Sequence, residues 1–247
     1  MQGWGVEDAF VVFDQQDSGC TSWGVERDGD RWFVKTATTA VARTSLTRAV
    51  ALHSAVRHEV LVGPAHVFDG LDGITLVYPW RPGRVLNQST TSGSDRSGLE
   101  SFQRLPLAQV AGAVDQVLDA HLAIAAAGWV AGDLYDGCFL YDEPTARMSL
   151  VDLDEYRPRP FLLHGDRAPG STRYMAPEEF RRGALIDHRT TVFALGRTAL
   201  HLLTGPDGWR GTPEQQQVVA RATAPEPDER YQSVRDFVAA WRAVSSR

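Results

Sequence analysis

The chain has 247 residues, 43% of them hydrophobic, which is enough to bury a full core but short for two independent domains. Its formal net charge is −6 with charged residues scattered, which excludes the basic surface of a typical nucleic-acid-binding protein and a polybasic membrane anchor. No apolar run is long enough to span a bilayer, the first residues do not resemble a secretory signal, and only two cysteines occur, so we expect a soluble, cytoplasmic protein.

The pattern of residues 6–35 predicts three strands, with a tight Asp28-Gly29 turn before the third. The third strand ends on Lys35, the single lysine among the 25 lysine and arginine residues of the chain. Arginine stands at all the other basic positions, so the remaining lysine indicates a place where a compact ammonium is needed rather than a planar guanidinium. We therefore predict that Lys35 is functional; the alternative is a solvated lysine at a strand end.

Helices and a further strand are expected in the next hundred residues. Apolar residues at helical spacing predict a helix over 44–57, which contains no acidic side chain. Residues 73–83 predict a strand that runs into a proline-containing linker. The polar stretch 87–104, rich in Ser, Thr and Gly, predicts a flexible surface insertion. Residues 107–127 predict a long helix that ends at a glycine.

Three short blocks follow this helix in a fixed order. They are G-D-L-Y-D-G-C at 132–138, L-V-D-L-D-E-Y at 150–156, and G-S-T-R-Y-M-A-P-E-E at 170–179. In this order they resemble the catalytic loop, the metal-binding D-F-G motif and the end of the activation segment of a protein kinase. The resemblance covers nearly the whole chain, and the A-P-E block is its most specific part.

The resemblance implies an α+β, protein-kinase-like fold over residues 1–247, with two lobes. The N-lobe, about 1–80, would hold a small five-stranded antiparallel sheet and one helix. A hinge near 79–83 would connect it to a mostly helical C-lobe, about 84–247, with the polar surface insertion near its start.

The resemblance also implies phosphoryl transfer from ATP with Mg²⁺ or Mn²⁺ as the metal. Asp133 would orient the accepting hydroxyl, Lys35 would pair with the α- and β-phosphates, and Asp152 would hold the metal. Asp154 stands two residues after Asp152, where the family has glycine. It is either a second metal ligand or a carboxylate that caps a turn.

The nucleotide would be bound by the N-lobe and the hinge. Gly19 lies where a glycine that covers the phosphates is expected. Adenine would bind to the carbonyl of Pro79 and the N–H of Arg81, with Tyr78 as the gatekeeper beside it.

Five positions depart from the family pattern, and each removes a polar or glycine residue that the family uses. They are Ser22, Ala49, Tyr135, Cys138 and Thr191. The most direct loss is at Cys138, because a thiol is a poor ligand for Mg²⁺ where the family has an amide oxygen. Gly132 also replaces the arginine that reads a phosphate on the activation loop, so we expect phosphorylation of that loop not to be required.

One long-range contact distinguishes the classes of phosphotransferase. The resemblance places Arg230, in P-D-E-R-Y-Q-S-V, in a buried ion pair with Glu178 of the A-P-E block. Small-molecule phosphotransferases share a G-D-L-type loop but lack this pair, so the leading prediction is a kinase acting on Ser/Thr hydroxyls of a protein. Two alternatives stay open: a pseudokinase that binds nucleotide or acts as a scaffold, and a small-molecule phosphotransferase.

Overall fold

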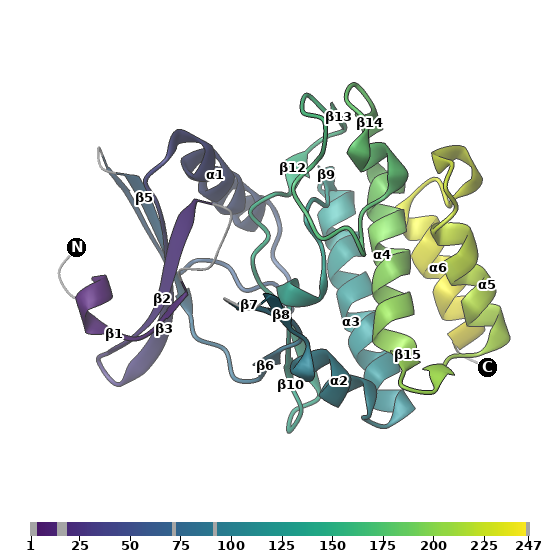
Figure 1. The fold of residues 1–247 in the computed structure, drawn as a ribbon, viewed down its shortest axis with the longest axis horizontal. Coiled ribbons are helices and arrows are strands. Elements are labelled where there is room, and N and C mark those ends of the chain that lie inside the picture. Colours follow the sequence, from purple (N-terminus) through teal and green to yellow (C-terminus); the bar gives the residue numbers. More distant parts are fainter. Residues whose placement is uncertain (1–3, 14–18, 71–72, 91–92, 246–247) are drawn as a thin grey trace.

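The structure is a computed structural model that describes residues 4–13, 19–70, 73–90 and 93–245. An antiparallel sheet and one helix form its N-terminal part, and the longer of the remaining helices lie together in its C-terminal part (Figure 1). The chain is therefore of the α+β class, as predicted. Among the residues described, no helix combines the length and the apolar character needed to cross a bilayer.

Five strands make up the N-terminal sheet, in the order β1-β2-β3-β5-β4, and every neighbouring pair is antiparallel. They are β1 (Ala9–Phe13), β2 (Cys20–Arg27), β3 (Asp30–Ala37), β4 (His66–Gly70) and β5 (Gly73–Pro79). Asp28 and Gly29 connect β2 to β3 with φ of 56° and 85°, the left-handed backbone of a tight hairpin turn. These observations confirm the predicted sheet and its Asp-Gly turn.

Helix α1 (Ala40–Ala55) covers one face of this sheet (Figure 1). The apolar side chains buried between them are Cys20, Ala37, Ala42, Leu46, Ala49, Ile74 and Leu76. The helix begins four residues before the predicted start. The hydroxyl of Thr39 accepts a hydrogen bond from the N–H of Ala42 (3.2 Å), which caps the first turn at that point.

The C-terminal part is built around α4, which packs against α3, α5 and α6. The helices of this part are α2 (Ser97–Gln103), α3 (Leu107–Ala126), α4 (His188–Leu203), α5 (Pro213–Ala222) and α6 (Val234–Ser245). The long helix predicted over 107–127 is confirmed as α3, and Gly128 follows it with a φ of 83° that permits the chain to turn away. A single large core joins these helices to the end of α1.

Short strands and 3-10 turns connect the longer elements. The strands are β6 (Arg84–Val85), β7 (Gln88–Thr90), β8 (Gly93–Asp95), β9 (Trp129–Val130), β10 (Phe139–Asp142), β11 (Arg147–Leu150), β12 (Arg157–Pro158), β13 (Phe161–Leu162), β14 (Leu185–Ile186), β15 (Thr204–Gly205) and β16 (Gly208–Trp209). Three of them, in the order β11-β10-β6, form a small sheet between the N-terminal sheet and the helices. The loops predicted to carry the chemistry begin where β9 and β11 end.

The predicted flexible insertion at 87–104 is wrong in its second half. Residues 88–95 form the short β7–β8 hairpin, but residues 97–103 form α2. Leu99 and Phe102 are only 4% and 2% exposed, and their side chains anchor this helix to the C-terminal core. Two apolar residues three positions apart, within an otherwise polar stretch, are enough to bury one face of a two-turn helix.

Candidate active site

The ammonium of Lys35 lies between two carboxylates. Its Nζ is 2.5 Å from Oδ1 of Asp152 and 2.5 Å from Oδ2 of Asp154, residues more than a hundred positions away in the sequence. Lys35 comes from β3, and the two aspartates come from the loop that follows β11. The structure therefore brings together three of the predicted site residues.

Burial and charge act in opposite directions on this ammonium. Burial alone would lower the pKa of Lys35, but the carboxylates of Asp152 and Asp154 outweigh it and raise the pKa well above its ordinary value. The lysine is therefore charged, while burial raises the pKa of the Asp154 carboxyl although the ammonium of Lys35 opposes this. The side chain of Asp152 is 40% exposed while that of Asp154 is 9% exposed, so a cation from solvent can reach Asp152.

Asp133 lies in the loop after β9, close enough to Lys35 and Asp152 for their charges to act on it. Burial raises the pKa of this carboxyl to about 7, and the charges of Asp152 and Glu155 add to the effect. The N–H of Ser171 and the ammonium of Lys35 oppose it. A carboxylate with a pKa near neutrality is suited to accept a proton at physiological pH.

The backbone is strained at both candidate catalytic aspartates. Asp133 and Asp152 have φ of 51° and 60°, a left-handed conformation that costs roughly 1–3 kcal/mol for a residue other than glycine. Cys138 lies between these two loops, with its Sγ 3.3 Å from the carbonyl oxygen of Asp133 and 3.9 Å from that of Asp152. The thiol, at the position where the resemblance expects an asparagine, therefore faces a backbone carbonyl of each loop.

The structure accounts for two of the other departures. The hydroxyl of Thr191, on α4, accepts a hydrogen bond from the N–H of Ala131 (3.0 Å), so it supports the loop before Asp133. At Gly132, a Cβ would overlap the carbonyl oxygen of Glu155, so no side chain fits where the family has arginine.

A buried acid that sequence reasoning missed connects the Asp133 loop to the segment after it. Asp136 is fully buried, with Oδ2 2.7 Å from Nη1 of Arg173 and Oδ1 2.9 Å from Nδ2 of Asn87. Arg173 belongs to the G-S-T-R-Y-M-A-P-E block, so this ion pair connects that block to the loop that contains Asp133. In the sequence, the features that could have predicted this ion pair were an acid inside the first block and an arginine inside the third.

Helix α1 presents a positively charged side chain to the site rather than an acidic one. Arg48 donates from Nη2 to Oε2 of Glu155 (2.7 Å) and from Nε to the carbonyl oxygen of Asp154 (3.2 Å). Ala49, at the position where the family has glutamate, is 1% exposed within the apolar cluster under the sheet. Glu59, the first acid after the helix, pairs with Arg147 at 3.0 Å on the surface and takes no part.

The predicted nucleotide-binding residues are only partly described. Gly19 has a φ of 71°, and a Cβ there would come within 3.3 Å of the Thr39 hydroxyl, so it lies near the start of α1. The rest of the loop that would cover the phosphates, residues 14–18, lies outside the described residues. At the predicted hinge, the N–H of Trp80 donates to the carbonyl of Arg31 (3.0 Å). In the described part of the chain no backbone hydrogen bond uses the N–H of Arg81, which leaves this donor able to bind a base.

A row of aromatic rings lies on the same face of the sheet as Lys35. The ring of Phe33, two residues before Lys35 on β3, is 5.8 Å from that of Phe13 and 6.2 Å from that of Tyr78. Pro79 follows Tyr78 at the end of β5 and is paired with Trp32 of β3. Such rings could stack on a planar base, or they could fill the space that a base would need.

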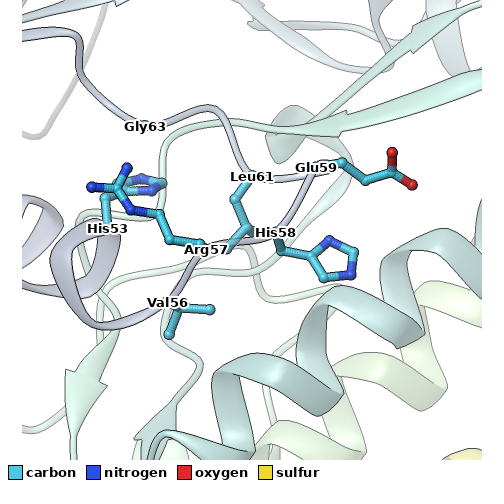
Figure 2. Close-up of a pocket in the computed structure, with 7 residues that line it drawn as sticks. All are labelled: His53, Val56, Arg57, His58, Glu59, Leu61 and Gly63. Atoms are coloured by element: carbon cyan, nitrogen blue, oxygen red, sulfur yellow. The ribbon is translucent and has the colours of Figure 1, made fainter.

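Two cavities lie away from this site. One, of about 420 Å³, is at the C-terminal end of α1 (Figure 2). It is lined by His53, Val56, Arg57, His58, Glu59, Leu61 and Gly63. The other, of about 490 Å³, lies beside Trp4 and Trp32 at the outer face of the sheet. Neither is lined by any of the predicted site residues.

No protein-family model matches the chain, and no curated protein matches it in sequence. Its function therefore has to be inferred from its residues and their geometry.

The residues present fit one divalent cation better than two. Within the described ranges no group of three or more His, Cys, Asp or Glu side chains is arranged to hold a metal. Mg²⁺ does not require such a group, because it keeps several waters and binds through one or two carboxylates together with phosphates. Asp152 fits that use. Asp154 is buried against Lys35, and the Cys138 thiol faces backbone carbonyls, which favours the single-ion alternative.

Proposed function

We propose that the protein transfers the γ-phosphoryl group of ATP to Ser or Thr hydroxyls of a protein substrate, within a two-lobed, protein-kinase-like fold. The observation that carries the proposal is the contact of the single lysine of the chain, Lys35, with Asp152, beside an Asp133 whose pKa is about 7. A cation, an exposed metal-binding carboxylate and a base are the groups that phosphoryl transfer requires.

Each residue has a definite part in this reaction. Bound ATP would supply the phosphoryl group, and Mg²⁺ on Asp152 would neutralise phosphate charge. Asp133 accepts the proton of the substrate hydroxyl as the hydroxyl oxygen bonds to phosphorus, and the bond from phosphorus to the leaving phosphate oxygen breaks. Lys35 holds the phosphates in place. Burial raises the pKa of the Tyr135 hydroxyl, so this group stays protonated and can donate a hydrogen bond where the family uses lysine.

The buried pair of Glu178 and Arg230 supports a protein kinase over a small-molecule phosphotransferase. The two side chains are joined by two hydrogen bonds of 2.7 and 2.8 Å, as the resemblance predicts. A second candidate function, a nucleotide-binding scaffold without transfer, is favoured by Cys138, whose thiol faces backbone carbonyls at the position where the resemblance expects a metal-binding amide oxygen.

Transfer can be tested with purified protein, labelled ATP, Mg²⁺ or Mn²⁺ and a generic acceptor protein. We expect label on Ser or Thr of the acceptor, and a loss of about 10²–10⁴-fold in Asp133→Asn, because that variant cannot accept the proton. Glu59→Gln, which removes an exposed acid away from Lys35, is the matched control and should keep full activity. Nucleotide binding without transfer in the unaltered protein would contradict the proposal and favour the scaffold.

The dependence of transfer on pH should follow Asp133. Because the carboxyl accepts a proton only when ionised, kcat/KM should rise with pH and level off above the free protein's pKa of about 7. Rates measured across both sides of neutrality check this expectation. A flat kcat/KM profile through this range would show that Asp133 is not the base.

A further inference from the structure

The contact between α1 and the D-L-D-E segment, residues 152–155, has its charges reversed from the protein-kinase pattern. In the protein kinases that the chain resembles, an acid on this helix pairs with the lysine of the sheet. Here α1 has no acid among its 16 residues. The acids stand on the segment instead, where Asp154 contacts Lys35 and Glu155 contacts Arg48 of the helix.

Several bonds join α1 to this segment. Glu155 accepts from Arg48 through Oε2 (2.7 Å) and from the Ser45 hydroxyl through Oε1 (2.5 Å). Arg48 Nη2 also donates to Ser45 Oγ (3.0 Å), which closes a ring of three side chains. The side chains of Arg48 and Glu155 are 19% and 20% exposed, so solvent screens this pair less than a surface pair.

Lys35 stands one step beyond this ring. Within the described part of the chain, no side chain of α1 hydrogen-bonds to its ammonium; both partners, Asp152 and Asp154, belong to the loop after β11. The helix reaches a partner of Lys35 through the bond from Arg48 Nε to the backbone carbonyl of Asp154 (3.2 Å), which involves backbone rather than the Asp154 carboxylate. The side-chain position of Asp154 is fixed by Lys35 itself and by burial.

We propose that Asp154 takes the place of the helix acid as the positioning residue for Lys35, and that Arg48 and Glu155 form a separate tether that holds α1 to the same segment. This inference rests on the proposed function in that Lys35 is taken to bind the phosphates. One loop would then fix the lysine, the metal-binding carboxylate and the helix together. A displacement of α1 would therefore leave the contact between Lys35 and Asp154 intact.

The single lysine makes this measurable without nucleotide or metal. In protein labelled with ¹⁵N-lysine, the ammonium of Lys35 is the one lysine side-chain signal, and the exchange of its protons with water at fixed pH reports how tightly it is paired. In the unaltered protein, a scalar coupling across the hydrogen bond should connect Lys35 Nζ to the carboxyl carbon of Asp154. That measurement needs no variant and stands even where a variant fails to fold.

Two variants separate the two halves of the proposal. Asp154→Asn keeps the shape but removes the charge, and should speed ammonium exchange by about tenfold, the effect of losing a charge-assisted hydrogen bond. Arg48→Ala should leave ammonium exchange within about twofold of the unaltered protein, yet speed amide exchange along α1 by about tenfold. The charge-swapped pair Arg48→Glu with Glu155→Arg should restore protection of α1, and Glu59→Gln should change neither readout.

The outcomes are decisive for each half. An Arg48→Ala variant that speeds ammonium exchange as much as Asp154→Asn would overturn the proposal, because the helix would then be what holds Lys35. So would an Asp154→Asn variant with unchanged exchange, or a missing coupling to Asp154 in the unaltered protein. None of these readouts requires phosphoryl transfer, so a protein that proves inactive would sink the proposed function and leave this result standing.

Discussion

Replacing Lys35 with methionine should reduce phosphoryl transfer by about 10³-fold, the usual effect of removing a charge that stabilises the transition state. Methionine keeps an unbranched stem of similar length but has no charge to place on the phosphates. Lys35→Arg should retain only a little activity, because a planar guanidinium does not fit the space in which one ammonium lies 2.5 Å from each of two carboxylates. Initial rates with labelled ATP measure both effects.

Loss of activity in this variant has to be separated from loss of folding. Without Lys35, the buried carboxylate of Asp154 has no counter-charge, and leaving one partner of a buried pair costs about 3–5 kcal/mol. The double variant Lys35→Met with Asp154→Asn removes that charge as well. It should recover stability in thermal melts and remain inactive. A methionine variant with full activity would remove Lys35 from the nucleotide site.

Glu178→Ala and Arg230→Ala should each destabilise the C-terminal part by about 3–5 kcal/mol, which is a fall in Tm of roughly 6–20 °C for a chain of this size. The two side chains are 3% and 0% exposed, so either change leaves a buried, uncompensated charge. The guanidinium of Arg230 also donates to the carbonyls of Arg189, Ala224 and Pro225, which uses all five of its N–H groups.

The double variant distinguishes a true pair from two separate defects. Because both residues serve one interaction, removing both should cost little more than removing one. The exposed pair of Arg182 and Asp166, 2.9 Å apart with side chains 67% and 88% exposed, provides the matched control and should change Tm very little when truncated. Losses that add in full would show that Glu178 and Arg230 do not act together.

Local patterns in the sequence were sufficient for several of the longer elements. The Asp28-Gly29 turn and the long apolar stripe of α3 are determined by neighbouring residues, so both were predictable. The helix α2 was not, because its burial depends on where Leu99 and Phe102 meet the core rather than on local composition. The Glu178–Arg230 pair was predictable only through the resemblance, since 52 residues separate its members.

The departures from the family pattern show why the site itself was harder to predict. Thr191 and Gly132 looked like losses when compared position by position. In the structure, the Thr191 hydroxyl makes the bond that supports the loop, and the backbone of Glu155 occupies the space beside Gly132. Arg48 and Glu155 are 107 positions apart, and only Glu155 lies in one of the three blocks. Compensation of this kind comes from residues that meet only after folding, so a single sequence carries no sign of it.

The placement of the single lysine has a practical consequence for covalent chemistry. Over these 247 residues, a reagent selective for lysine side chains has one target, and that target is 5% exposed with a pKa raised by two carboxylates. Acylation requires the uncharged amine, so labelling should be slow in the folded protein and should accelerate whenever the contact between Lys35 and the aspartates opens. The rate of modification by such a reagent would therefore report how often the contact between Lys35 and the two aspartates opens.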